Sequence, residues 1–463
     1  MLSSALARGR EVWSAFWSPE IPDERRAARE KWEALAPALK DKNQVLGRHS
    51  AGCSATYGVM EACNFKCTAC YLADTANDTP PLPFEEVKVQ LDRIREHLGP
   101  WGNTQITAGE VTLLPCDDLI RILKYCQEIQ LSPMVMTHGQ NILQEPNYLH
   151  RLMVEGGLDK ISIHIDTTQK GRLGLRARDT EADIHWIRDA FANLVRQARR
   201  ITGRPLAAAT TMTVTEDNFH QIPDVMRWLI ANNDAFRMVS FQPTAEVGRT
   251  RVKEQVEKQP ELWDQICEGV GETLNRHAFK IGHPKCNTTT LMFVIEFENN
   301  GEMERHVMEV TRPDVEDDQT FLESLLNDGF AGFSPDGEPN AVVLARILGR
   351  LRKHPKMAAS IPAFCVRRAW DERSWIPRFL RAVSTGKRWR INPFVIIIHN
   401  FMSSHQLETK EGKERLEACF FRVPIDGEMV SMCELNGTDM RRKLNHDDQD
   451  RLITVVEPIR RAG

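Results

Sequence analysis

Three cysteines in one short segment are the residues of this sequence with the clearest chemistry. The segment YGVMEACNFKCTACYLAD carries Cys63, Cys67 and Cys70 within eight residues. Iron–sulfur clusters take cysteine thiolates as ligands, and three of them can wrap one side of a four-iron cube. Because three thiolates serve four irons, one iron stays open to another molecule. A zinc site with a distant fourth ligand and a chance grouping are the alternatives.

A second set of cysteines lies further along the chain: Cys286, Cys365, Cys419 and Cys433. The last two flank FRVPIDGEM, which predicts a hairpin with an Asp-Gly turn and brings their thiols near each other. Four thiolates suit a second, fully ligated [4Fe–4S] cluster. Structural thiols and a zinc site are the alternatives. The other cysteines are best interpreted as packing residues or have no assigned role: Cys116, Cys126 and Cys267, and Cys53.

A regular alternation of short apolar runs and longer segments of helical period surrounds the first cysteine segment. The strand-like runs are 55–60, 104–108, 133–137, 160–166, 207–214 and 237–242. The helix-like segments between them are 84–98, 117–129, 146–156, 182–201 and 218–231. Strict alternation predicts right-handed βαβ units, and therefore a parallel sheet with helices outside it. Periodicity fits both a partial barrel and an open doubly wound sheet.

The alternation of strand-like and helix-like segments divides the chain into three parts. Residues 1–50 predict an N-terminal helical segment, with an amphipathic helix at 23–39. Residues 51–250 form the alternating core, and residues 251–463 predict a C-terminal extension of mixed α+β type that can hold the second cluster. Since the first cysteines follow the first strand, they lie at the strand ends where such enzymes carry their chemistry.

Composition limits the class of protein. The chain has 463 residues, with 41% hydrophobic and 27% charged residues and a formal net charge of -4. A nucleic-acid binder normally shows a basic excess, so that class is disfavoured. No stretch approaches the roughly 18 apolar residues of a membrane span, and the first residues do not resemble a signal peptide. We therefore expect a cytoplasmic protein with reduced cysteines.

The spacing C-x3-C-x2-C after the first strand of a six-strand β/α series resembles the signature of the radical S-adenosylmethionine superfamily. The resemblance implies a partial (β/α)6 TIM-like barrel with a [4Fe–4S] cluster on Cys63, Cys67 and Cys70. It further implies that the open iron chelates the amino and carboxylate groups of S-adenosylmethionine. An electron from the cluster then cleaves this cofactor to a 5′-deoxyadenosyl radical, which abstracts hydrogen from an unactivated C–H bond.

The same resemblance names residues that contact S-adenosylmethionine. ITAGEV after the second strand is similar to the superfamily's Gly-Gly-Glu-Pro segment, so Gly109 and Glu110 are expected to receive the amino group. A carboxylate is a suitable acceptor for an ammonium group. Family members often carry an aromatic residue near the adenine, just before the third cysteine; here that position is Ala69, and Tyr71 directly after Cys70 is the candidate instead. The remaining expected contacts lie on later strands: His164 and Asp166, which point the same way by the period of two, and Gln242.

Three segments are similar to stretches of the tetraether-synthase-like radical enzymes: 239–249, 282–289 and 399–436. With the basic, Trp-containing segment 366–390, they favour a small-molecule or lipid substrate, with modification of lipid or isoprenoid chains, and peripheral association with a membrane. For the basic segment taken alone, a solvated helix face with its aromatic residues in the core is the favoured interpretation. The resemblance also implies a low-potential electron donor of ferredoxin or flavodoxin type.

Two other functions remain as alternatives. The first is a peptide-modifying radical enzyme, or maturase, with an auxiliary cluster, although the segment before Cys53 is short for a peptide-gripping domain. The second is a non-catalytic zinc- or cluster-bearing binding protein. Iron uptake and cleavage of S-adenosylmethionine separate the enzymes from the binding protein.

Overall fold

The computed structural model describes residues 2–17, 30, 32–40, 44, 52–250, 259–276, 279–312, 315–326 and 340–445. Its centre is one open sheet of eleven strands in the order β11-β10-β1-β2-β3-β4-β5-β6-β9-β7-β8. The first six strands are β1 (Cys53–Ala55), β2 (Asn103–Ile106), β3 (Ser132–Thr137), β4 (Lys160–His164), β5 (Ala207–Val214) and β6 (Phe236–Pro243). They are parallel and lie side by side in chain order. The predicted six-strand α/β architecture is confirmed, and the sheet does not close.

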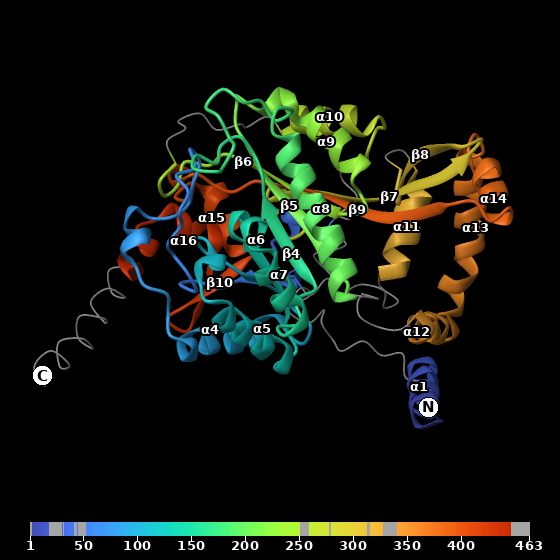
Figure 1. The fold of residues 1–463 in the computed structure, drawn as a ribbon, viewed down its shortest axis with the longest axis horizontal. Coiled ribbons are helices and arrows are strands. Elements are labelled where there is room, and N and C mark those ends of the chain that lie inside the picture. The colour runs from blue at the N-terminus through green and yellow to red at the C-terminus, as the bar shows by residue number, and fades with distance from the viewer. Residues whose placement is uncertain are drawn as a thin grey trace, which may run out of the picture.

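Helices pack against the outer face of this parallel sheet (Figure 1). They are α4 (Phe84–Leu98), α5 (Cys116–Glu128), α6 (Gln140–Gln144), α7 (Pro146–Val154), α8 (His185–Thr202) and α9 (Ile222–Ala231). In α4 the buried residues Val87, Leu91, Ile94 and Leu98 recur at helical spacing, and acidic residues in its first turn favour its N-terminus. Apolar side chains such as Ile106, Val135 and Ile163 face these helices in the main core.

The first strand differs from its prediction. Residues 55–60 were expected to be the strand, but β1 ends at Ala55. Thr56 N still donates to Gln105 O at 3.0 Å, and the chain then leaves the sheet, with Gly58 at a φ of 69°. Only glycine adopts that left-handed conformation without a steric penalty. The apolar residues Val59 and Met60 that follow pack in the main core instead of extending the strand.

The C-terminal extension adds strands to both edges of the same sheet. On one edge β9 (Trp389–His399) runs parallel to β6, followed by antiparallel β7 (Asn287–Asn299) and β8 (Glu302–Glu309). On the other edge β10 (Arg422–Ile425) runs parallel to β1 and pairs with β11 (Glu428–Ser431). Asp426 and Gly427 both have positive φ at this hairpin, as an Asp-Gly turn requires. The chain segments before and after residue 250 therefore share one sheet.

The other helices of the extension are α10 (Gln259–Val270), α11 (Glu316–Leu325), α12 (Asn340–Lys353), α13 (Pro355–Asp371), α14 (Ile376–Ser384), α15 (Lys410–Glu417) and α16 (Met432–Gly437). At the N-terminus, α1 (Leu2–Trp17) packs on α12 through Ala15, Val342 and Ala345. Of the helix expected at 23–39, the structure describes residues 30 and 32–39: residues 30 and 32–34 are helical, and Pro37–Leu39 form a 3-10 turn. Within the described part of the chain, no helix is both long and apolar enough to cross a bilayer.

Candidate cluster and cofactor site

The cysteine loop, residues 56–83 between β1 and α4, lies over the carboxyl ends of the parallel strands. Cys63, Cys67 and Cys70 are all half-buried in it. Loops that follow β2, β4 and β6 each form hydrogen bonds with it. Because parallel strands present their carboxyl ends at one edge, the topology gathers these loops around the three thiols.

The loop after β2 fixes the start of the cysteine loop. Gly109 N donates to Met60 O at 2.8 Å, and Glu110 N donates to Ala62 O at 2.9 Å. A Cβ atom on Gly109 would lie 2.2 Å from Glu61 O and 2.4 Å from Ala62 O. Glycine is therefore required at this position by backbone packing.

The loop after β4 pairs with the middle of the cysteine loop. Lys66 N donates to Lys170 O at 2.7 Å, and Thr68 N donates to Thr168 O at 3.0 Å. Beside this pairing, the Phe65 ring stacks on the His138 ring with centroids 3.7 Å apart. These contacts place Cys67 between two backbone bonds to one neighbouring loop.

The loop after β6 holds the end of the cysteine loop. Arg249 Nη2 donates to Cys70 Sγ at 3.4 Å, and Arg249 N donates to Leu72 O at 3.0 Å. Thr250 Oγ1 accepts from Cys70 N at 3.1 Å. Gly248 has a φ of 53°, and a Cβ there would lie 2.3 Å from Tyr71 O. Sequence reasoning did not single out Arg249 or Thr250, although their position just after a strand end was a usable signal.

Burial and hydrogen-bond donors act on the thiols of this loop in opposite directions. Burial raises the pKa of Cys63 to about 11, and burial followed by the neighbouring Cys70 raises the pKa of Cys67. The uncoordinated thiols therefore hold their protons, which ligation to iron displaces. Phe65 N donates to Cys63 Sγ at 3.5 Å, and Arg249 places a positive charge at Cys70. Hydrogen bonds and charge at the sulfurs are groups that tune a cluster.

Glu110 is fully buried and crosslinks the ends of β2 and β3. Its carboxylate accepts from the Thr112 and Thr137 hydroxyls, and from His138 N at 2.7 Å. Burial raises its pKa, while these donors oppose the shift. His138 Nδ1 accepts from Gln140 N at 3.1 Å, so the proton of this ring lies on Nε2, which is 2.7 Å from Asn64 Oδ1. Burial and then Arg172 lower the pKa of His138 to about 3, so the ring is neutral near neutral pH.

Tyr71 bridges the cysteine loop to the loop after β2. Its hydroxyl donates to Ala108 O at 2.5 Å, and burial raises its pKa to about 12. The Arg441 guanidinium lies 5.2 Å from the centroid of its ring. Arg441 also forms a bidentate, buried ion pair with Glu61, with N–O distances of 2.9 and 3.0 Å. No pattern in the sequence linked Arg441 to Glu61, because 380 residues separate them.

His164, Asp166 and Gln242 lie on the inner side of the sheet, away from the helices. His164 Nε2 is 2.5 Å from Asp166 Oδ2, and Thr213 N donates to the same carboxylate at 2.7 Å. Burial would raise the pKa of Asp166, but His164 and the other donors bring it down to about 2. Gln242 aligns with Thr213 in the β5–β6 register. The structure thus pairs His164 with Asp166 and places Gln242 on β6, next to Thr213 of β5.

Three of the four C-terminal cysteines come together. Cys286 precedes β7, Cys419 follows α15 and Cys433 begins α16, and the three thiols lie within electrostatic reach of one another. Burial raises the pKa of Cys286 to about 11 and that of Cys433 to about 12. Cys365 is exposed on α13, at the opposite end of the molecule from α15 and α16 (Figure 1). The predicted four-cysteine set is therefore not assembled in this structure.

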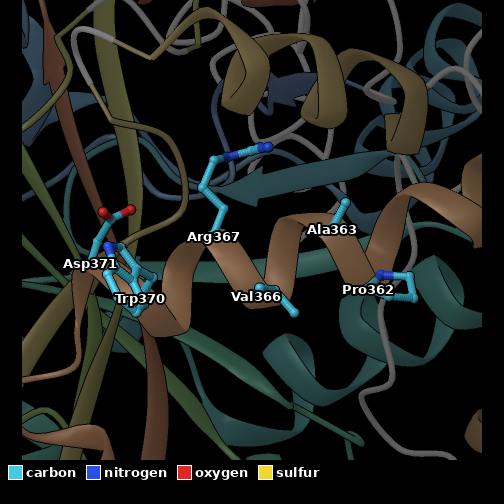
Figure 2. A pocket seen from close by; sticks show the side chains of 6 residues that line it. All are labelled: Pro362, Ala363, Val366, Arg367, Trp370 and Asp371. Atoms are coloured by element: carbon cyan, nitrogen blue, oxygen red, sulfur yellow. The ribbon is translucent and has the colours of Figure 1, made fainter.

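The basic segment 366–390 covers the end of α13, α14 and the start of β9. Trp375 is buried, whereas Trp370 is 69% and Trp389 is 50% exposed. A hollow of about 560 Å³ lies along α13, lined by Pro362, Ala363, Val366, Arg367, Trp370 and Asp371 (Figure 2). Most cations of the segment have acidic partners inside the protein, as in Arg367–Asp318, Arg378–Glu304, Arg388–Glu298 and Arg390–Glu296.

Among the described residues, no three His, Cys, Asp or Glu side chains converge as the ligands of a single metal ion do. Ligands of one zinc ion must all lie about 2.0–2.3 Å from the same atom. Thiolates of a cubane bind separate iron atoms, so they need not converge in this way. Three thiols on one loop, with N–H and guanidinium donors at the sulfurs, fit a cluster of that kind.

Comparisons with known proteins agree with this geometry. The family profile described as Radical SAM superfamily matches residues 57–229. A 7,8-dihydro-6-hydroxymethylpterin dimethyltransferase from Methanocaldococcus jannaschii is 22% identical over 201 residues, which cover 43% of this chain and 38% of that protein. The chain therefore spans well under half of that curated relative.

Two solved structures show weaker likeness. Streptococcus suis SuiB bound to S-adenosylmethionine is 18% identical, with a TM-score of 0.35 and 47% of each chain covered. The structure described as anSMEcpe with bound AdoMet is 13% identical, with a TM-score of 0.34, and covers 46% of this chain and 57% of that chain. The resemblance to tetraether-synthase-like enzymes stays a prediction. Residues 57–229, which include the three cysteines of the loop, therefore match the Radical SAM superfamily of enzymes.

Proposed function

We propose that this enzyme reductively cleaves S-adenosylmethionine and uses the resulting 5′-deoxyadenosyl radical to abstract hydrogen from an unactivated C–H bond. The observation that carries the proposal is the cysteine loop, which the loops after β2, β4 and β6 hold over the strand ends. When bound, a [4Fe–4S] cluster on Cys63, Cys67 and Cys70 supplies the electron and an open iron for the cofactor. This chain's residues hold the three thiols in place and shield them from water.

Glu110 and Gly109 are proposed to receive the amino group of S-adenosylmethionine. Four protein donors already hold the Glu110 carboxylate in one orientation, so it is positioned before any ligand arrives. A carboxylate oxygen can accept more than one hydrogen bond, and an ammonium can share these oxygens. His164, Asp166, Gln242 and Tyr71 are proposed to contact the rest of the cofactor or the substrate, since they border the same strand ends.

The substrate is proposed to carry a saturated hydrocarbon segment, as in a lipid or isoprenoid chain. The inner face of the sheet supports this, because Met134 and Met136 on β3 and Val395 and Ile397 on β9 are only partly buried there. Apolar side chains of this kind favour contact with hydrocarbon over water. A substrate radical must also be kept from water, which an apolar surface assists.

A second cluster is proposed on Cys286, Cys419 and Cys433, without Cys365. The support is that three separate segments bring these thiols together, beside the Arg415 side chain. Iron analysis tests this: wild type should take up about eight irons, and Cys419→Ser about four. Equal iron content in the two proteins would leave these cysteines as structural thiols. Stoichiometric zinc in their place would show a zinc site.

Anaerobic reconstitution tests the main function. Wild type should bind iron, show the absorbance of a [4Fe–4S] cluster and form 5′-deoxyadenosine with a strong reductant. Cys67→Ala should lose the activity, whereas Cys116→Ser, which changes a half-buried cysteine on α5, should keep it. Full-occupancy zinc without iron would refute the proposal and favour a binding protein.

The substrate class is tested by hydrogen transfer. Deuterated lipid extract should pass deuterium into 5′-deoxyadenosine if the substrate is a lipid or isoprenoid. Transfer only from a peptide would favour the peptide-modifying alternative. The electron donor is proposed to be a low-potential carrier protein, and a reducing cytoplasmic location is proposed because it keeps all these thiols free for iron.

A further inference from the structure

We propose that an exposed basic surface beside the cysteine loop is the docking site of an acidic, low-potential electron-carrier protein. The surface consists of Lys66, Lys170, Arg176 and Arg178 around Leu173 and Trp186, and is here named the cationic rim. The inference rests on the proposed function, because only a redox cluster needs such a partner.

The cationic rim is contiguous with the loop that carries the cluster ligands. Lys66 lies directly before Cys67, and its backbone N–H donates to Lys170 O at 2.7 Å. Gly171 packs next to Phe65, and the Arg172 guanidinium lies 5.2 Å from the Phe65 ring centroid. A protein seated on this surface would therefore lie against the backbone that holds Cys67. Electron transfer requires such close approach.

The four cations of the rim are exposed, and their charges are not used inside the protein. Within the residues that the structure describes, none of the four side chains forms an ion pair or a hydrogen bond. The nearby acids Asp179 and Asp183 instead accept from backbone N–H groups of their own turn, at Arg176 and Thr180. Unpaired cations at a surface attract an acidic partner and accelerate its association.

The centre of the surface is apolar. Leu173 is 59% and Trp186 is 54% exposed. The Trp186 ring covers Gly174, where an added Cβ would lie 2.5 Å from it. An apolar centre with a charged rim is the usual arrangement of a protein-binding surface. The cationic rim, with its apolar centre, therefore fits a small folded carrier protein better than a free anion.

The basic segment 366–390 is the main competing surface, but most of its cations, unlike those of the cationic rim, are paired with acidic side chains. Arg378, Arg388 and Arg390 each have a glutamate partner on β7 or β8. That segment also lies at the far end of the molecule from the cysteine loop (Figure 1). These cations of segment 366–390 pair with strands β7 and β8, whereas those of the cationic rim remain available to a partner.

The transfer at this surface involves one electron and no proton. The reduced carrier, a flavodoxin hydroquinone or a reduced ferredoxin, loses one electron. A [4Fe–4S] cluster held by Cys63, Cys67 and Cys70 would accept that electron and change from the 2+ to the 1+ state. No bond forms or breaks in this step.

Charge reversal of the rim tests the proposal on the reconstituted protein. The variant Lys66→Glu, Lys170→Glu, Arg176→Glu and Arg178→Glu is compared with a matched control that reverses four exposed cations elsewhere: Lys124, Arg200, Arg204 and Arg237. Stopped-flow absorbance follows cluster reduction by flavodoxin hydroquinone and by reduced ferredoxin, and calorimetry measures carrier binding. At low salt the rim variant should be reduced by at least one carrier about tenfold more slowly or worse, with weaker binding.

A neutral reductant separates this proposal from the proposed function. Photoreduced 5-deazariboflavin should reduce wild type, rim variant and control at equal rates. Unchanged carrier-driven rates and unchanged binding in the rim variant would overturn the docking proposal, while deazariboflavin still reduces the cluster. Absence of a reducible cluster in wild type with every reductant would overturn both proposals.

Discussion

Replacing Arg441 by methionine tests whether the C-terminal segment stabilises the cysteine loop. Arg441 is 4% exposed, and its guanidinium binds the fully buried Glu61 carboxylate, two residues before Cys63. Methionine keeps much of the side-chain volume but leaves the Glu61 charge without its cation. Breaking a buried ion pair by removing one partner costs about 3–5 kcal/mol. We expect a loss of unfolding free energy of that size.

The double variant Arg441→Met with Glu61→Gln provides the internal check. It removes both charges, and the glutamine amide oxygen can still accept from Gly58 N, which donates to Glu61 Oε1 at 3.1 Å. The double variant should therefore be more stable than Arg441→Met alone, by roughly 2 kcal/mol or more, because no uncompensated charge is buried. The matched control is Arg151→Met, which breaks the exposed pair with Asp117 and should have a far smaller effect.

The assays are urea denaturation of the apo-protein, followed by circular dichroism, and iron retained after desalting of the reconstituted protein. Arg441→Met should lower the denaturation midpoint and release iron faster. The reason is that Arg441 holds Glu61, which lies in the cysteine loop two residues before Cys63. The reasoning is refuted if Arg441→Met is as stable as Arg151→Met and retains iron as wild type does. Equal stability of the single and double variants would show that the buried charge carries no penalty.

Three further changes give separate tests. Gly109→Ala places a Cβ 2.2 Å from Glu61 O, so iron uptake should fall by more than half while secondary structure persists. Full uptake with normal stability would contradict the backbone contact. Cys365→Ser should leave the iron content unchanged, whereas Cys419→Ser should lower it, as measured by inductively coupled plasma spectrometry. Burial raises the pKa of Glu309 to about 7 from the ordinary 4.5, so the folded protein binds this proton more tightly than the unfolded chain. The stabilising contribution of Glu309 is complete below the unfolded pKa and is lost as the pH rises through about 7. Glu309→Gln should therefore reduce the fall of the melting temperature with pH between roughly pH 5 and 8. An unchanged slope of melting temperature against pH would exclude Glu309 as the source of that fall.

Local sequence patterns were enough to predict the repeating strand–helix core and the position of the three clustered cysteines. Helical spacing of apolar residues in 84–98 and continuous apolar runs such as 207–214 are local signals, and α4 and β5 have these bounds in the structure. The family of the domain followed from the same short segments. Such features depend on neighbours within a few residues, which the sequence states directly.

The identity of the distant segments that complete the sheet and the site became visible in the folded chain alone. Strands β9 and β10 lie at opposite edges of the sheet, and Cys365 lies apart from Cys286, Cys419 and Cys433 although its spacing did not exclude it. Arg249 reaches Cys70, and Arg441 reaches Glu61, across 179 and 380 residues of chain. Contacts of this kind are fixed when whole elements pack together to bury apolar surface and pair buried charges, and no local pattern records the partner.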